Sequence, residues 1–310
     1  MKKMKQLFAV VAFALAFSFV FMNAQDVEAA GNERQEGVVY VNPTYNGERV
    51  WKSINKMRIE DGTESSFNVY FGNEGDYISD VKVNKKGLIA GVTYQYSGYW
   101  NEYNYSCYGT IGLVAQKAGN YKVTFKVCKA DGSVAGSYTM KVYCTDDTYL
   151  YKNIKLGSTT VYKTATTKKG TTYTTKSESN YKVSSGLTSA KLSITPNKGY
   201  KITGMVVVYR DSKGMPKTQK LKNNKSIKLS QQYDSRSYNS DGTTSLNTRM
   251  WTEVFVSYKD TYLGTSRTYS VAKKSGVPMI KCVTKNIDGT KTTTFSQISY
   301  AGGDISFWRY

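Results

Sequence analysis

The chain has 310 residues and a formal net charge of +20, with 43 Lys and Arg against 23 Asp and Glu. It contains no histidine, which excludes Ser-His-Asp and Cys-His nucleophile arrangements and histidine-based zinc sites. The 27 tyrosines, the abundance of Val and Thr and the scarcity of proline (4 residues) favour pleated, half-buried strands. We therefore predict an all-β protein.

Residues 1–30 have the layout of a secretory signal peptide. Three of the first five residues are lysines, 7–22 is an uncharged apolar run, and small residues follow at Ala29 and Ala30. The alternative is an uncleaved membrane anchor, for which the run is short because a spanning helix needs about 20 residues. We expect cleavage near residue 30, a secreted, extracellular protein, and no transmembrane segment in the mature chain.

Residues 31–50 are predicted to form a polar N-terminal arm with one short strand near 38–41, and residues 51–147 the first domain. Within this domain short runs of alternating apolar and polar residues are separated by turn residues. The predicted strands are 55–59, 66–71, 78–83, 88–96, 107–115, 120–129 and 137–144. Strands spaced in this way, with turns between them, indicate a β-sandwich with Greek-key connections.

The clearest of these elements is the hairpin at 119–144. Its first strand alternates Tyr, Val and Phe with Lys and Thr, and Asp131-Gly132 marks the turn. In the second strand Met140, Val142 and Cys144 share one face. Because an isolated hairpin is marginal in water, we interpret it as part of a larger sandwich.

The segment AQKAGNYKVTFKV resembles the "AGxYxVTxxV" opening of the penultimate strand in bacterial immunoglobulin-like and PKD-type domains of secreted surface proteins. The resemblance covers residues 51–144. It implies a sandwich in which the Tyr121 hydroxyl bonds the upstream backbone. It also implies an extracellular spacer, adhesion or ligand-binding role. The full fold prediction is two β-sandwich (immunoglobulin-like) domains after an N-terminal signal peptide.

Residues 148–310 are predicted to form a second, basic, β-rich domain after a linker at 145–148. The Thr-, Ser- and Lys-rich stretch 157–185 is assigned to strands rather than to a disordered, glycosylated linker, because it lacks proline and spaces Val and Tyr regularly. Residues 191–209 predict two strands around an "ITPxxGY" turn, which is similar to that of internalin-type surface repeats, although no Trp follows the second strand.

The remaining elements of this domain are a polar loop, a strand pair and a C-terminal hairpin. Residues 231–247 are predicted to be a long polar loop, and 249–258 and 262–271 a closing strand pair with Trp251 as a core anchor. Residues 277–310 contain a hairpin turned at Asp288-Gly289. The apolar residues Ile305, Phe307 and Trp308 near the end predict that the terminus docks on the second domain.

Four cysteines follow the signal segment, and none has CxxC spacing, so we expect no metal or redox site. If 106–116 and 120–129 are neighbouring antiparallel strands, Cys107 and Cys128 are the candidate disulfide. The sequence pattern argues against this disulfide, because it places Cys128 on the polar face of its strand. The alternative is free thiols. The acidic residues show no EF-hand spacing, and we expect no cofactor.

The positive charge is concentrated in the second half. Residues 31–150 contain 13 Lys and Arg and 13 Asp and Glu, whereas residues 151–310 contain 27 and 8, a formal charge of +19. Lysine is a hydrated point charge, which suits diffuse attraction to an anionic envelope polymer or a host glycan or mucin better than sequence-specific binding of nucleic acid. The alternative is a basic surface that only aids solubility. The candidate contacts are Lys213, Lys217, Lys220, Lys222 and Lys225.

A second candidate ligand surface is the tyrosine-rich stretch 94–108. Tyr99, Trp100 and Tyr103 are the candidate ligand-binding residues, because exposed aromatic rings with a polar edge suit sugar rings or a protein partner. The alternative is cross-strand aromatic pairing in a hairpin.

These observations predict a secreted, non-catalytic binding or adhesion protein of a Gram-positive-type cell surface, held to the cell wall by charge. One alternative is a secreted glycan-acting enzyme that relies on carboxylates. Another is a structural spacer without a ligand.

Overall fold

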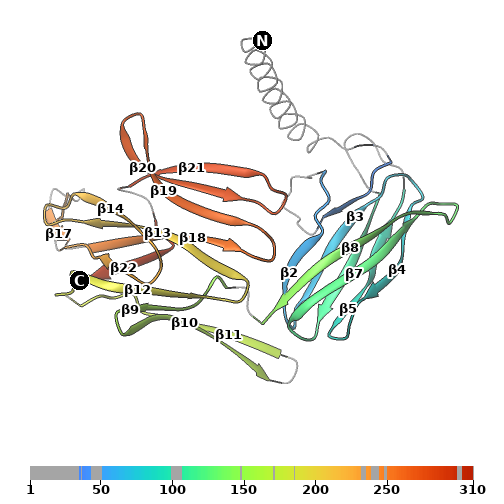
Figure 1. The fold of residues 1–310 in the computed structure, drawn as a ribbon, viewed down its shortest axis with the longest axis horizontal. Coiled ribbons are helices and arrows are strands. Elements are labelled where there is room, and N and C mark those ends of the chain that lie inside the picture. Colours follow the sequence, from blue (N-terminus) through green and yellow to red (C-terminus); the bar gives the residue numbers. More distant parts are fainter. Residues whose placement is uncertain are drawn as a thin grey trace, which may run out of the picture. The chain divides into compact units, whose positions relative to one another are not determined.

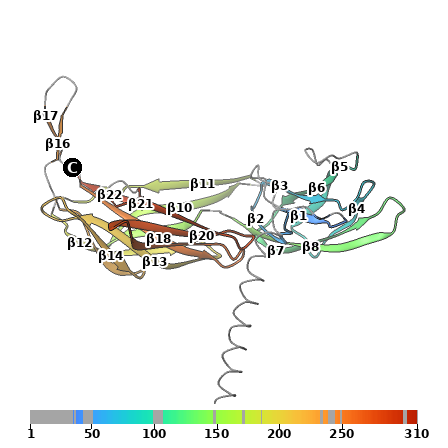
Figure 2. The same cartoon turned by 90° about the horizontal axis from the view of Figure 1, so that it is seen from above.

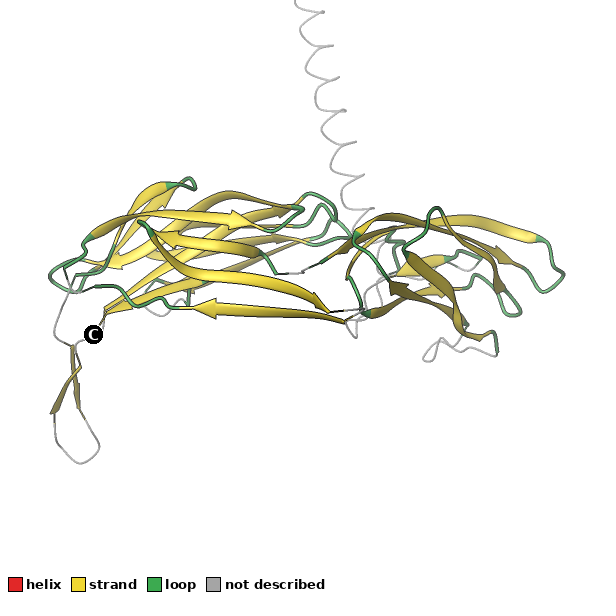
Figure 3. Cartoon of the chain, turned by 90° about the horizontal axis from the view of Figure 1, so that it is seen from below, coloured by secondary structure: helices red, strands yellow, loops and turns green. Residues whose placement is uncertain are grey.

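The computed structural model describes residues 35, 37–42, 51–98, 107–146, 149–169, 172–184, 186–231, 235–238, 244–247, 250–298 and 302–309. Every regular element in these residues is a β-strand (Figure 3), which confirms the all-β class. The chain divides into two compact units. The first comprises Met1–Met57, Glu64–Val114 and Tyr121–Val142, and the second Arg58–Thr63, Ala115–Asn120 and Tyr143–Tyr310. The predicted signal peptide lies outside the described residues, and the predicted domain boundaries stay predictions.

The first eight strands form two four-stranded sheets, and most of their residues belong to the first unit (Figure 1). The strands are β1 (Tyr40–Asn42), β2 (Lys56–Glu60), β3 (Glu64–Tyr70), β4 (Tyr77–Val83), β5 (Leu88–Tyr96), β6 (Tyr108–Ala115), β7 (Gly119–Cys128) and β8 (Val134–Thr145). The sheet orders are β1-β3-β6-β5 and β2-β8-β7-β4. These orders correspond to the ABED and GFC sheets of an immunoglobulin-like sandwich, with β2 added beside β8.

The core of this sandwich is built by the alternation that the sequence predicted. On β7 the side chains of Tyr121, Val123, Phe125 and Val127 are buried, and the polar residues between them are more exposed. Phe125 meets Phe67 of the opposite sheet, with ring centroids 5.7 Å apart. The predicted β7–β8 turn is confirmed: the Lys129 N–H bonds the Ser133 carbonyl at 2.8 Å, and Gly132 has a φ of 82°.

The predicted Cys107–Cys128 disulfide is not formed, because all four cysteines are free thiols. The strands β6 and β7 were expected to be neighbours, but they belong to opposite sheets. Cys107 Sγ donates to the Gly98 carbonyl at 2.7 Å, and Cys128 Sγ lies 3.2 Å from Ser79 Oγ. Cys128 was also expected on a polar face, and it is buried.

The later strands belong to the second unit. They are β9 (Tyr151–Leu156), β10 (Thr159–Lys169), β11 (Thr172–Ser179), β12 (Ser189–Pro196), β13 (Tyr200–Arg210), β14 (Pro216–Leu221), β15 (Lys225–Lys228), β16 (Ser235–Tyr238), β17 (Thr244–Asn247), β18 (Met250–Asp260), β19 (Ser266–Lys274), β20 (Val277–Lys285), β21 (Lys291–Gln297) and β22 (Ile305–Arg309). One sheet has the order β11-β10-β9-β12-β15. The other has the order β14-β13-β18-β19-β20-β21, with β22 also paired to β18.

The run Met205–Val208 in β13 explains how this unit is layered. All four side chains are buried, which is the pattern of a strand covered on both faces. Met205 and Val207 join the large core that includes Leu192 of β12 and Phe307 of β22, so this core lies between the two sheets. Val206 and Val208 join a smaller cluster on the other face with Phe255 and Ile280.

Several predictions for the second half are confirmed. Residues 157–185 supply β10 and β11, and the "ITPxxGY" turn joins β12 to β13, with Gly199 at a φ of 87°. The C-terminal residues dock as β22 on β18, and Ile305 and Phe307 are buried.

Two predictions for the second half are wrong. Trp251 is 46% exposed, because the alternation of β18 turns Thr252 and Val254 inward instead. The predicted polar loop at 231–247 contains the β16–β17 hairpin, which projects away from the sheets (Figure 2).

Candidate functional site

The five lysines predicted as contacts all lie between β13 and β15. Lys213 is in the β13–β14 turn, Lys217 and Lys220 are on β14, Lys222 follows β14, and Lys225 opens β15. All five are exposed. The predicted aromatic contacts Tyr99, Trp100 and Tyr103 lie outside the described residues.

This segment crosses from one sheet of the second unit to the other. The strand β14 pairs with β13, whereas β15 pairs with β12. The connection is held by Asn223, whose side-chain amide exchanges hydrogen bonds of 2.9 and 2.7 Å with the backbone N–H and carbonyl of Ile194. Gln219 adds a link between the strands, because its Oε1 accepts the Lys228 N–H at 3.1 Å.

A cleft of about 400 Å³ opens where these four strands meet. The register places Tyr209 of β13 opposite Lys217 of β14, and Ser189 of β12 opposite Lys228 of β15. The residues that line the cleft are Thr188, Ser189, Tyr209, Arg210, Asp211, Lys217, Lys228, Leu229 and Gln231. Its volume falls in the range of small-molecule sites, about 300–1,000 Å³.

Backbone hydrogen bonds fix the walls of this cleft. The Leu229 N–H bonds the Thr188 carbonyl at 2.9 Å, and the Gln231 N–H bonds the Arg210 carbonyl at 3.0 Å. The Arg210 N–H in turn bonds Ser230 Oγ at 2.9 Å, and Ser230 is buried. A site held by such bonds is formed before a ligand arrives, so binding does not have to order its walls.

Three cations and one carboxylate line the cleft, which gives it a net positive charge. Lys217 Nζ lies 3.5 Å from Asp211 Oδ2, and Lys228 Nζ lies 5.7 Å from the centroid of the Tyr209 ring. The Met215 N–H lowers the pKa of Asp211, and the Lys213 N–H and the charge of Lys217 act in the same direction. Asp211 is therefore ionised at neutral pH and holds Lys217 beside the cleft.

This set of groups suits binding of an anion better than acid–base catalysis. Asp211 is the one carboxylate among the lining residues, whereas an enzyme that hydrolyses a glycosidic bond in this way uses a pair of carboxylates. The hydroxyls of Thr188, Ser189 and Tyr209 and the Gln231 amide supply further hydrogen-bonding groups.

The sequence indicated only part of this site. Lys217 was predicted, but Tyr209, Arg210 and Ser189 were not. Lys228 belongs to the same basic segment and could have been included. Tyr209 and Arg210 reach the cleft through the adjacent β13–β14 hairpin, whereas Ser189 reaches it by pairing with the distant Lys228, which no local pattern reveals.

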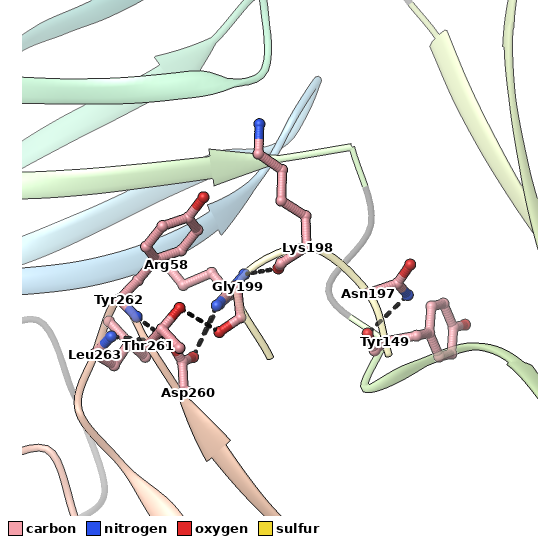
Figure 4. Close-up of polar contacts among 9 residues, drawn as sticks. All are labelled: Arg58, Tyr149, Asn197, Lys198, Gly199, Asp260, Thr261, Tyr262 and Leu263. Atoms are coloured by element: carbon pink, nitrogen blue, oxygen red, sulfur yellow. Dashed lines mark hydrogen bonds and ion pairs between the residues drawn. The ribbon is translucent and has the colours of Figure 1, made fainter. Parts of the chain in front are cut away.

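A second polar cluster of this unit is structural (Figure 4). Arg58 binds Asp260 Oδ2 through Nη2 at 2.8 Å and Nε at 3.2 Å, and both side chains are almost fully buried. Asp260 Oδ1 accepts the N–H groups of Tyr262 and Leu263, at 2.8 and 2.9 Å. The guanidinium carbon lies 4.5 Å from the centroid of the Tyr200 ring. Both charges are compensated within the cluster, so it tightens the turn after β18.

In the part of the chain that the structure describes, no three Cys, Asp or Glu side chains gather closely enough to hold a metal ion. The same residues contain no helix with the length and apolar character needed to cross a membrane.

Neither a protein-family profile nor a curated protein matches the chain. Among solved structures it is similar to the D00-D0 domain of intimin, with 8% identity over 88% of this chain and 97% of that one and a TM-score of 0.25. It is also similar to the C-terminal domain of the AgI/II polypeptide BspA of Streptococcus agalactiae, with 8% identity over 88% of this chain, 100% of that one and a TM-score of 0.22. Likeness at this level carries no argument about function.

Proposed function

We propose that this chain is a non-catalytic binding protein of an extracellular surface, and that its second unit adheres to an anionic polymer. The observation that carries the proposal is the basic cleft, where Arg210, Lys217 and Lys228 converge from three strands. The exposed lysines of β14 and β15 extend the positive surface beyond the cleft. The polymer is a cell-envelope polyanion or an acidic host glycan.

The distribution of charge supports this function. Residues 151–310 hold 27 Lys and Arg against 8 Asp and Glu, so the attraction of a polyanion adds to the local contacts in the cleft. Such attraction is screened by salt, since the Debye length is about 8 Å at physiological ionic strength.

The test measures binding of the full chain to immobilised heparin by surface plasmon resonance at increasing salt. The cleft variant combines Lys217→Gln with Lys228→Gln. Its matched control combines Lys122→Gln with Lys141→Gln, which removes two exposed charges from the first unit. We expect affinity to fall about tenfold for the cleft variant and less than about twofold for the control. Wild-type affinity should fall steeply as salt rises.

Two outcomes would reject the proposal. One is a wild-type chain that does not bind heparin at low salt. The other is an equal loss for the two variants, because it would mean that net charge alone, and not the cleft, attracts the polymer.

A further inference from the structure

Five aromatic rings form a continuous row across one sheet of the first unit. Successive ring centroids are 5.3 Å apart for Tyr40 and Trp51, 5.6 Å for Trp51 and Tyr70, 5.9 Å for Tyr70 and Tyr108, and 5.3 Å for Tyr108 and Tyr94. We call these five residues the aromatic row. It passes over β1, β3, β6 and β5, which are consecutive in the sheet β1-β3-β6-β5.

The register of the sheet creates this row. Tyr40 lies opposite Tyr70, and Tyr70 lies opposite Tyr108. Because side chains alternate along a strand, Phe67 and Val69 of β3 point into the core, where they are buried, and Tyr70 points to the other face. The aromatic row therefore lies on the outer face of the sandwich.

The row is partly open to solvent. Tyr94 is 47% exposed, and Trp51, Tyr70 and Tyr108 are of intermediate exposure, whereas Tyr40 is buried and anchors one end. Rings held against one another lose little freedom when a ligand packs on them.

A line of polar side chains runs beside the aromatic row: Asn68 and Thr110 lie two residues from Tyr70 and Tyr108 on their strands, and Thr93 is next to Tyr94. Asn68 lies opposite Thr110, and Thr110 Oγ1 donates to Asn68 Oδ1 at 3.0 Å. Thr93 Oγ1 donates to the Thr110 carbonyl at 3.3 Å. Neither the aromatic row nor this polar line contains a charged residue.

We infer that the aromatic row is a second binding surface, and that it takes a neutral polysaccharide. A sugar ring has a C–H face that packs on an aromatic ring, and a rim of hydroxyls that pairs with amide, hydroxyl and phenol groups. A line of rings beside a line of amide and hydroxyl groups presents both kinds of contact along a chain of sugars. Charge argues for a neutral chain: none of the eight residues named for the row and the polar line is charged, and residues 31–150 hold 13 Lys and Arg against 13 Asp and Glu.

Cross-strand aromatic pairs also stabilise a sheet, so the experiment must separate binding from stability. Tyr94→Ala is the informative variant, because Tyr94 is the most exposed ring of the row. Tyr149→Ala is its matched control, since Tyr149 is 46% exposed and belongs to the second unit. The probes are the neutral hexasaccharides of cellulose, chitin and mannan, with a hyaluronan hexasaccharide as the charged comparison. Binding to the full chain is measured by calorimetry at low and high salt.

We expect at least one neutral hexasaccharide to bind with an affinity that salt does not change. Tyr94→Ala should lower the affinity for this hexasaccharide about tenfold and leave the melting temperature unchanged. Tyr149→Ala should lower the affinity less than about twofold. Binding should also shift the fluorescence emission of Trp51. The Trp51→Phe variant should lack that shift and remain folded.

The inference is overturned if none of the neutral hexasaccharides binds. It is also overturned if Tyr94→Ala and Tyr149→Ala bind equally well, or if only hyaluronan binds at the row. None of these results bears on heparin binding by the second unit, so the two proposals can fail separately.

Discussion

At the scale of single residues, two carboxylates of the second unit differ in how well their charge is compensated. Asp260 is buried, whereas the Asp304 side chain is 18% exposed. Asp260 has the Arg58 guanidinium and two N–H groups around it. Asp304 accepts the Val256 N–H at 2.7 Å, but its cation, Arg267, is 3.6 Å away. Partial shielding of the carboxylate from water is the largest effect at Asp304 and raises its pKa above the ordinary 3.8, although Val256, Arg267 and Tyr269 act in the opposite direction.

This raised pKa predicts a dependence of stability on pH. The folded state holds the Asp304 proton more tightly than the unfolded chain does. The free energy of unfolding should therefore fall as the pH rises from 3.8 to the folded pKa, and then stay level with respect to this group. Asp304→Asn should remove that fall. The measurement is urea unfolding of both proteins between about pH 4 and pH 7.

Asp131 supplies a control, because its pKa is shifted in the direction opposite to that of Asp304. Hydrogen bonds from Ser133 lower its pKa, so its contribution to stability is present above the unfolded pKa and is lost on acidification through the folded pKa. The Asp131→Asn variant should keep the fall in the free energy of unfolding that Asp304 produces as the pH rises. A wild-type slope that persists in Asp304→Asn would show that other groups produce it.

At the scale of elements, strand patterns predicted the core of the first unit but not the partners of its strands. The alternation of Tyr121, Val123, Phe125 and Val127 identified a half-buried strand and its inward face, and the structure confirms both. The error at Cys107 and Cys128 came from pairing β6 with β7 because they are adjacent in sequence. Sheet membership is decided by contacts between distant residues, which local periodicity does not encode.

In the second unit, the strand pattern of β18 does not identify which residues form the core. The residues Val254, Phe255 and Val256 of β18 are all buried, so this stretch has no alternation from which to assign the inward face. Trp251 had been predicted as the core anchor of the closing strand pair. The large aromatic residue of the core between the two sheets is instead Phe307, supplied by the C-terminal strand β22.

This placement predicts contrasting effects of two aromatic deletions. Phe307→Ala should reduce the free energy of unfolding by about 3 kcal/mol, because Phe307 is 1% exposed and its loss leaves a cavity between the sheets. Trp251→Ala should change it by about 0.5 kcal/mol, as expected for an exposed side chain. Urea unfolding of the two variants compares them directly. Similar losses would mean that β22 is not part of the folded core.

At the scale of the whole molecule, the chain presents two surfaces of different chemistry. The aromatic row lies in the first unit and contains no charge, whereas the basic cleft lies in the second unit among most of the excess lysines. The sequence predicted the segregation of charge, since it follows from counting residues. It could not predict the aromatic row, whose members come from five separate places in the chain: four lie on strands that the sheet brings together, and Trp51 lies outside the strands.

Because the two surfaces share no residue and belong to different units, we expect them to bind independently. Lys217→Gln with Lys228→Gln should leave the affinity for the neutral hexasaccharide within about twofold of wild type, and Tyr94→Ala should do the same for heparin. Each ligand should also bind equally well when the other is saturating, since coupling is reciprocal and would appear in both titrations. Calorimetry of each ligand with and without the other measures this directly. A change beyond about threefold in either titration would mean that a conformational change links the surfaces, and the effects of the two sets of substitutions would then not be additive.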